Sequence, residues 1–67
     1  MSQSWWRGRV LQQARHRRKL TQAALAQKVG VHKITISRLE RGDRQPSMDL
    51  LQKLAKALKV TLAELVK

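Results

Sequence analysis

Apolar residues recur along this chain at the spacing of helices. A first stripe, Val10 with Leu11 and Ala14, lies among strong helix formers in the segment 10–19. In the segment 48–59 four apolar residues stand at i, i+3, i+4 and i+7: Leu51, Leu54, Ala55 and Leu58. The pattern predicts an amphipathic helix over each segment.

Capping signals predict three further short helices. Apolar residues fill both positions of a hydrophobic staple in three places: Leu20 with Leu25, Val31 with Ile36, and Val60 with Leu65. Each staple encloses a candidate N-cap residue: Thr21, His32 and Thr61. Gly30 and Gly42 fit the left-handed position that ends a helix. Because 67 residues make one small domain, the sequence predicts an all-α fold of five helices in a single compact domain, 1–67.

The stretch "KITIS", residues 33–37, departs from this pattern. Its alternation is typical of a half-buried strand, yet the staple before it and Gly42 after it predict a helix over 33–41. In a helix Ile34 and Ile36 stand about 200° apart, so both cannot face one core. If Ile36 faces inward, Ile34 faces outward. Its companions on the outer face are polar: Lys33, Ser37, Arg38 and Arg41.

The charge of the chain is strongly positive. Fifteen Lys and Arg against four Asp and Glu give +11, and residues 1–44 hold eleven of the basic and two of the acidic side chains. Such a balance is typical of proteins that bind polyanions, of which nucleic acid is the commonest. A merely soluble basic protein, or a peptide that binds membrane surfaces, is the alternative.

Other classes of function find little support. The chain has no cysteine, and His16 and His32 lack acidic company, so we expect no metal site and no cofactor. No Ser/His/Asp or paired-carboxylate arrangement is present, so we do not expect an enzyme. No apolar run approaches the ~20 residues that span a bilayer, and no signal peptide is recognisable, so we expect no membrane association and a cytoplasmic protein.

The outer face of segment 33–41 has the chemistry of base recognition in the major groove. Arg38 can bind guanine O6 and N7 with two hydrogen bonds, and Lys33 can donate to the same acceptors. The Ser37 hydroxyl can donate or accept, and Ile34 can contact the methyl group of thymine. The alternative is a solvated basic helix in which Ile34 makes a dimer or crystal contact.

The segment "LTQAALAQKVGVHKITISRLERGDRQPS" closely resembles the Cro/cI-type helix–turn–helix family, the lambda repressor-like domains of phage repressors and small bacterial regulators. The resemblance is carried by twelve residues: Leu20, Thr21, Gln22, Leu25, Ala26, Gly30, Val31, Ile36, Ser37, Glu40, Gly42 and Pro46. It covers about residues 10–66, with the helix–turn–helix motif at 22–41. It implies a nucleoid-associated protein of a bacterium or phage, whose third helix enters the major groove while the second crosses the backbone.

The resemblance also implies roles for individual residues. Those expected to contact bases are Lys33, Ile34, Ser37 and Arg38. Those expected to contact phosphates are Gln22, Arg41 and Arg44. Arg15 corresponds to the arginine that forms a structural ion pair with the glutamate of the recognition helix, here Glu40. Two departures from the family pattern, Ala24 and His32, predict a slightly less well-capped scaffold.

Together these features predict a sequence-specific regulator, acting as a repressor, that binds double-stranded DNA. One alternative is an antitoxin-like or coactivator-like module that holds a protein partner. Another is a nucleoid or RNA binder that is indifferent to sequence.

We expect a weak homodimer that forms largely on a palindromic operator, because one recognition helix reads few base pairs. Pairing through Leu62, Leu65 and Val66 is one hypothesis, and completion of the core by Leu62 and Leu65 is its alternative. Of the two tryptophans, we expect either Trp5 or Trp6 to cover the edge of the core; otherwise the pair makes an oligomer contact or meets the DNA backbone.

Overall fold

The computed structural model describes residues 5–66, and this part of the chain forms five helices. They are α1 (Gly8–Arg17), α2 (Gln22–Val29), α3 (Lys33–Arg41), α4 (Met48–Leu58) and α5 (Leu62–Leu65). The predicted all-α, five-helix fold is confirmed, and "KITIS" lies in a helix. No helix within residues 5–66 is long and apolar enough to cross a membrane.

The helices begin and end at the predicted capping residues, and Ser47 adds a further cap. Thr21 and Ser47 accept backbone N–H groups of α2 and α4 through their hydroxyls, at 3.0 and 3.2 Å. Gly30 and Gly42 end α2 and α3 with φ of 77° and 79°, a conformation that glycine adopts without strain. His32 caps α3 as predicted, because its Nδ1 accepts the Ile34 amide at 3.1 Å. A ring nitrogen thus takes the place of the usual hydroxyl oxygen as acceptor.

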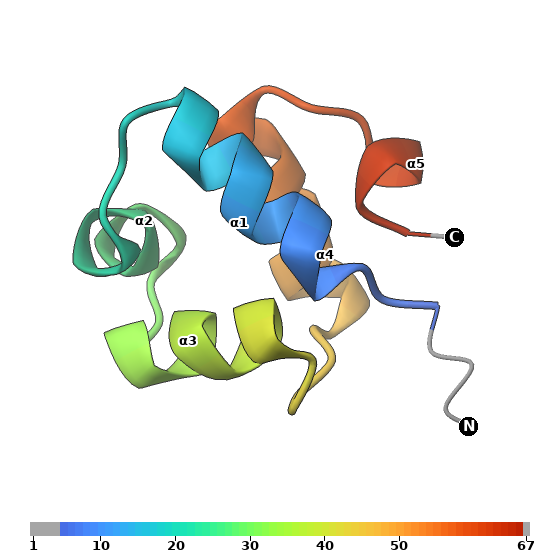
Figure 1. Cartoon of the computed structure of the whole chain (residues 1–67), viewed down its shortest axis with the longest axis horizontal. Helices are drawn as coiled ribbons and strands as arrows, with labels where there is room; N and C mark the ends of the chain where they lie inside the picture. The colour runs from blue at the N-terminus through green and yellow to red at the C-terminus, as the bar shows by residue number, and fades with distance from the viewer. Residues whose placement is uncertain (1–4, 67) are drawn as a thin grey trace.

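The core is formed by side chains from all five helices. In Figure 1, α1 runs through the middle of the molecule in front of α4, with α2 and α3 on one side and α5 on the other. The inner members of the three staples, Leu25, Ile36 and Leu65, are completely buried. Their partners before each helix pack half-buried against the same cluster: Leu20, Val31 and Val60. The staples therefore fix how each helix enters the core.

The start of the chain is anchored by Trp6. Its side chain is 5% exposed, and the indole Nε1 donates to the backbone oxygen of Leu39 at 2.8 Å. Trp6 also forms an antiparallel bridge with Val66, so both ends of the described chain meet beside α5 (Figure 1). The prediction that one tryptophan covers the edge of the core is confirmed for Trp6. Trp5 stays 40% exposed and packs edge-on against it.

Of the residues suggested for pairing two copies of the chain, Leu65 is not available at the surface, and pairing itself stays a prediction. Leu65 is completely buried, because the last turn of α5 packs into the core. Val66 is half-buried and bonded to Trp6 through the bridge. Leu65 therefore completes the core, as the alternative has it, while Leu62 remains 37% exposed.

Helix α1 begins at Gly8, two residues before the predicted start, in close backbone contact with α3. A Cβ at Gly8 would lie 2.3 Å from the backbone oxygen of Leu39 and 2.7 Å from that of Glu40. These atoms belong to the backbone and cannot rotate away. Gly8 thus lets the first turn of α1 touch the last turn of α3.

Gly8→Ala is expected to lower the free energy of unfolding by ~1–3 kcal/mol, because α1 and α3 must separate to admit the methyl group. Denaturant unfolding followed by circular dichroism measures this. Gln13→Ala, at an exposed position of the same helix, serves as control and is expected to change stability by less than ~0.5 kcal/mol. Equal stability of the Gly8→Ala protein and the wild type would contradict the close contact.

Candidate nucleic-acid interface

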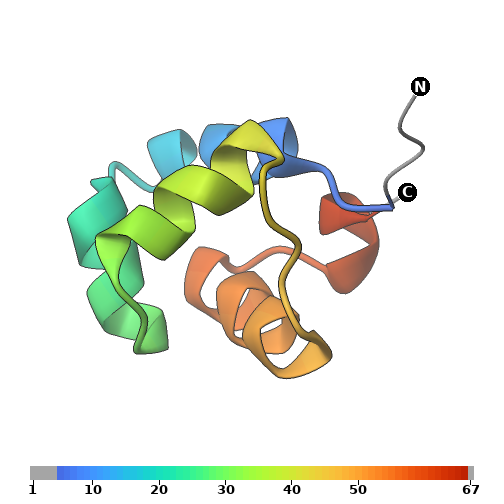
Figure 2. The same cartoon turned by 90° about the horizontal axis from the view of Figure 1, so that it is seen from below.

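Helix α3 is buried along one side and exposed along the other. Ile36, Leu39 and Glu40 face the interior. On the outer side Lys33 and Arg38 are exposed, Ile34 is 50% exposed and Ser37 is half-buried. Figure 2, seen from below, shows α3 lying across the face of the molecule turned toward the viewer. The four side chains that the sequence assigns to bases therefore share one accessible face.

Arg41 and Arg44 extend this face beyond the end of α3. Both are exposed: Arg41 is the last residue of the helix and Arg44 lies in the connection to α4. Arg41 Nε lies 3.2 Å from Asp43 Oδ2, and both side chains are more than half exposed. An exposed pair of this kind contributes little to stability, so a phosphate can replace Asp43 at small cost.

Behind α3 a buried ion pair ties the helix to α1. The Arg15 guanidinium donates to both Glu40 oxygens, through Nε to Oε2 and through Nη2 to Oε1 at 3.1 Å. Arg15 Nη1 also donates to the Leu20 backbone oxygen at 2.8 Å, just before α2. Arg15 is 7% and Glu40 9% exposed. The pair that the resemblance implies is therefore present, in a planar two-bond arrangement that favours one geometry.

Gln22, the first residue of α2, joins the same network. Its Nε2 donates to Glu40 Oε1 at 3.0 Å, so Glu40 contacts side chains from both α1 and α2. Sequence reasoning placed Gln22 near a phosphate and missed this contact, because nothing in a separation of 18 residues signals it. An amide nitrogen carries two hydrogens, so one can stay on Glu40 while the other reaches a phosphate.

The outer face of α3 carries cations, one hydroxyl and one apolar side chain. Within residues 5–66 no three His, Asp or Glu side chains are grouped to hold a metal ion. The chemistry available on α3 is donation of hydrogen bonds to acceptors, together with one apolar contact.

The chain belongs to the helix–turn–helix family of lambda repressor-like DNA-binding domains, whose profile, described as Helix-turn-helix, matches residues 11–65. In fold it is similar to the P22 c2 repressor in complex with a synthetic operator, with a TM-score of 0.87 and 37% identity. That match covers 90% of this chain and 91% of that one.

A second solved relative is SinR, described as the master regulator for biofilm formation, in complex with DNA. The TM-score is 0.79 and the identity 31%, over 85% of this chain and 95% of that one. The chain is also similar to a structure of SinR in complex with SinI protein. The TM-score is 0.77 and the identity 32%, over 82% of this chain and 54% of that one.

Among curated proteins the chain is similar to multiprotein-bridging factor 1 of Candida albicans, at 46% identity over 55 residues. Those residues are 82% of this chain and 36% of the relative, so the chain spans just over a third of that protein's length.

Proposed function

We propose that this protein is a sequence-specific regulator of transcription that reads the major groove of DNA with α3 and acts as a repressor. The observation that carries the proposal is the outer face of α3, where Ile34 stands 50% exposed among cations and a hydroxyl. An apolar side chain in that position has a natural partner in the thymine methyl group. Two similar proteins whose structures were solved in complex with DNA, the P22 c2 repressor and SinR, support this proposal.

Within this proposal, four residues contact bases: Lys33, Ile34, Ser37 and Arg38. Lys33 and Ile34 lie at the beginning of α3, the part of a recognition helix that enters the groove most deeply. Arg38, one turn further on, can form two hydrogen bonds with guanine. These side chains determine which sequence is bound.

Gln22, Arg41 and Arg44 contact phosphates instead. They lie at the start of α2, at the end of α3 and in the following connection, so they flank the residues assigned to bases. Contacts to phosphate fix orientation and register but carry little information about sequence. Neither catalysis nor a cofactor enters this proposal.

Selection of bound duplexes from a random pool tests the function. We expect one enriched motif, palindromic, with half-site centres about 34 Å apart. A pool that stays random after repeated rounds would favour a nucleoid role that is indifferent to sequence.

A weak homodimer on the operator belongs to the same proposal. The exposed apolar side chains at the end where the start of the chain meets α5 are Trp5 and Leu62. In the Trp5→Gln/Leu62→Gln variant, we expect binding to the palindrome to lose cooperativity, about tenfold in apparent affinity, while binding to one half-site is unchanged. Titration of both duplexes measures this, with unfolding as a check of the fold.

Met48→Gln is the control, because Met48 is another large exposed apolar side chain, 62% exposed at the start of α4, and belongs neither to the start of the chain nor to α5. It should leave cooperativity intact. Undiminished cooperativity in a folded Trp5→Gln/Leu62→Gln protein would place the pairing surface elsewhere.

A second candidate function is that of a coactivator-like or antitoxin-like module that holds a protein partner, with DNA binding secondary. Two relatives favour it: one is named a multiprotein-bridging factor, and SinR is found in complex with SinI. Purification from the native host discriminates the two functions. A stoichiometric protein partner combined with equal affinity for all duplexes would support the module.

A further inference from the structure

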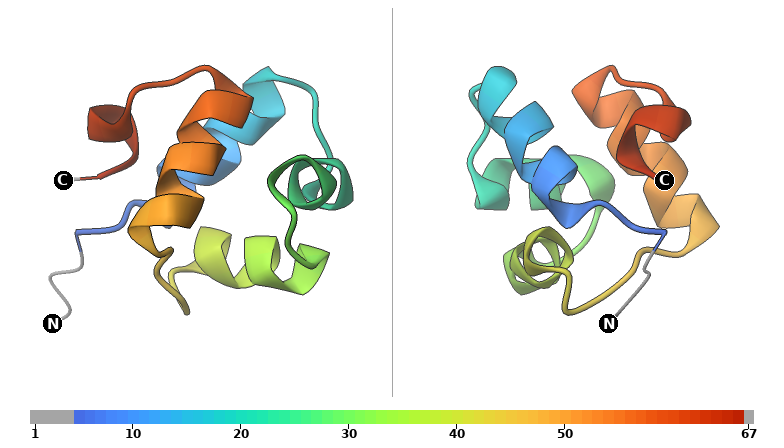
Figure 3. Two further views of the ribbon diagram at one scale, coloured as in Figure 1. Left: turned by 180° about the vertical axis from the view of Figure 1, so that it is seen from behind. Right: turned by 45° about the vertical axis from the view of Figure 1, so that its right-hand side comes forward.

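Much of the positive charge lies away from the outer face of α3. Six cations gather where α4 meets the ends of α1 and α2: Arg17, Arg18, Lys28, Lys53, Lys56 and Lys59. We refer to them as the α4 basic surface. Figure 3 shows α4 at the front of the rear view, whereas α3 runs along the lower edge of the molecule. The two positive surfaces therefore face different directions.

The first part of the α4 basic surface is a groove of about 260 Å³ between α2 and α4. Its lining residues are Lys28, Lys53, Lys56 and Ala57. Lys53 Nζ lies 3.2 Å from Asp49 Oδ2, but both side chains are more than half exposed, so the pair is weak. Lys28 and Lys56 form no ion pair with any described residue.

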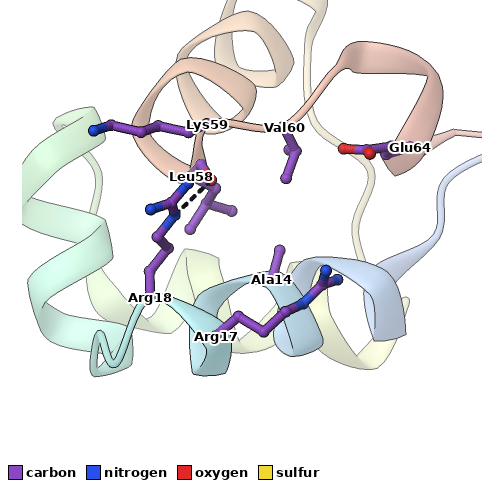
Figure 4. Close-up of a pocket in the computed structure, with 7 residues that line it drawn as sticks. All are labelled: Ala14, Arg17, Arg18, Leu58, Lys59, Val60 and Glu64. Atoms are coloured by element: carbon purple, nitrogen blue, oxygen red, sulfur yellow. Dashed lines mark hydrogen bonds between the residues drawn. The ribbon is translucent and has the colours of Figure 1, made fainter.

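The second part is a hollow of about 250 Å³ between the ends of α1 and α4. In Figure 4 the Arg18 side chain reaches from α1 to α4, where its Nε donates to the Leu58 oxygen at 3.1 Å. Arg17 and Lys59 lie around the same hollow, with Glu64 as the acidic member of the lining. Arg18 is thus held in place while part of its guanidinium remains available.

Helix dipoles alone do not account for this surface. Cations are favoured at helix C-termini, and α1, α2 and α4 all end here. Three such ends supply about −1.5 elementary charges in partial charge. The six cations exceed the two nearby carboxylates, Asp49 and Glu64, by four charges. A net positive potential therefore remains.

The lining of this surface indicates what it binds. A protein segment needs a buried aromatic or aliphatic anchor, and the apolar members of the described lining are small or already packed in the core: Ala14, Ala57, Leu58 and Val60. A phosphate backbone needs only cations. Lys53 and Lys56 are three residues apart on α4, about 5–6 Å at Cβ, so both can reach neighbouring phosphates of one strand, and Lys59 follows directly after the helix.

We propose that the α4 basic surface binds the phosphate backbone of a second DNA duplex, without regard to sequence, while α3 holds the first. One domain then bridges two DNA segments. The affinity of this second site is that of non-specific binding, ~10⁻⁴–10⁻⁶ M at physiological salt, and it weakens steeply as salt rises.

A capture experiment tests this. A duplex recovered by selection is immobilised and saturated with protein, and a fluorescent 30-base-pair duplex of random sequence is added over a range of salt. Three proteins are compared: the wild type, Lys28→Gln/Lys56→Gln, and a control that removes the same charge elsewhere, Arg7→Gln/Lys19→Gln. All four substituted positions are exposed, so we expect both variants to fold as the wild type does.

We expect the wild type and the control to capture the second duplex. Lys28→Gln/Lys56→Gln should bind the immobilised duplex as the wild type does. For capture of the second duplex, however, the slope of log K against log salt concentration should be shallower by about 1.8, because two phosphate contacts are lost. Absence of capture by the saturated wild type, or equal capture slopes in all three proteins, would overturn the proposal. Capture of fluorescent polyglutamate but not of duplex would also overturn it, in favour of an acidic protein partner.

Discussion

Replacing Glu40 with Ala is expected to lower the free energy of unfolding by about 3–5 kcal/mol. The change leaves the Arg15 guanidinium, 7% exposed, without its carboxylate, and it frees the Gln22 amide from its acceptor. Removing one partner of a buried ion pair is costly, because the remaining charge stays desolvated. Denaturant unfolding followed by circular dichroism measures the loss.

A double-mutant cycle identifies the cause. Arg15→Met combined with Glu40→Leu should destabilise less than Glu40→Leu alone, since no uncompensated charge is left. Asp43→Ala breaks the exposed pair with Arg41 and is the control, with an expected change below ~1 kcal/mol. Additive effects at positions 15 and 40 would show that the pair contributes no coupling energy.

Replacing Arg38 with Ala is expected to cost ~1–3 kcal/mol of binding free energy on the preferred duplex and to relax the preference at one base pair. Replacing Lys33 as well should bring the total to ~2–6 kcal/mol, because a second base contact is lost. Both side chains are exposed on α3, so stability should change little. Titration of duplexes that differ by single base pairs measures both effects.

Arg44→Ala is the matched comparison, since it removes the same kind of side chain from the connection after α3. It should weaken binding to all duplexes to a similar extent and reduce the salt slope by about 0.9. If Arg38→Ala also weakens binding to all duplexes equally, then Arg38 contacts a phosphate. The proposal that this side of α3 faces the bases would then be wrong.

The fold could be predicted because local signals agreed with one another. Each staple pairs two apolar residues five positions apart around a polar cap, and each inner member is buried as expected. At "KITIS" the strand-like alternation conflicted with these signals, and the helix formed. Burial of Ile36 and the left-handed turn at Gly42 outweigh the β-propensity of two isoleucines.

Contacts between distant segments could not be predicted in the same way. The early start of α1 depends on backbone contact between Gly8 and the end of α3, and on a tryptophan indole that donates to Leu39. Neither contact produces a periodic pattern of apolar residues from which it could be predicted. The hydrogen bond between Gln22 and Glu40 could not be predicted either, because a polar residue on a helix face can contact solvent as well as another side chain.

At the end of the chain, the sequence alone left two roles open for Leu65: a place in the core or a place in a dimer interface. In the structure Leu65 is completely buried in the core, and its staple partner Val60 packs against the same core. The backbone of Arg7 donates to the Leu65 oxygen at 3.1 Å, which fixes the two ends together. Leu62, at the opposite end of the same short helix, stays 37% exposed.

The ratio of two affinities tests the central proposal most directly. The protein is titrated at 150 mM salt with a duplex recovered by selection and with a scrambled duplex of the same length and composition. A regulator that reads bases through α3 should bind the selected duplex at least ~10³-fold more tightly. Equal affinities for the two duplexes would contradict sequence-specific recognition and leave a DNA-binding protein that responds to charge alone.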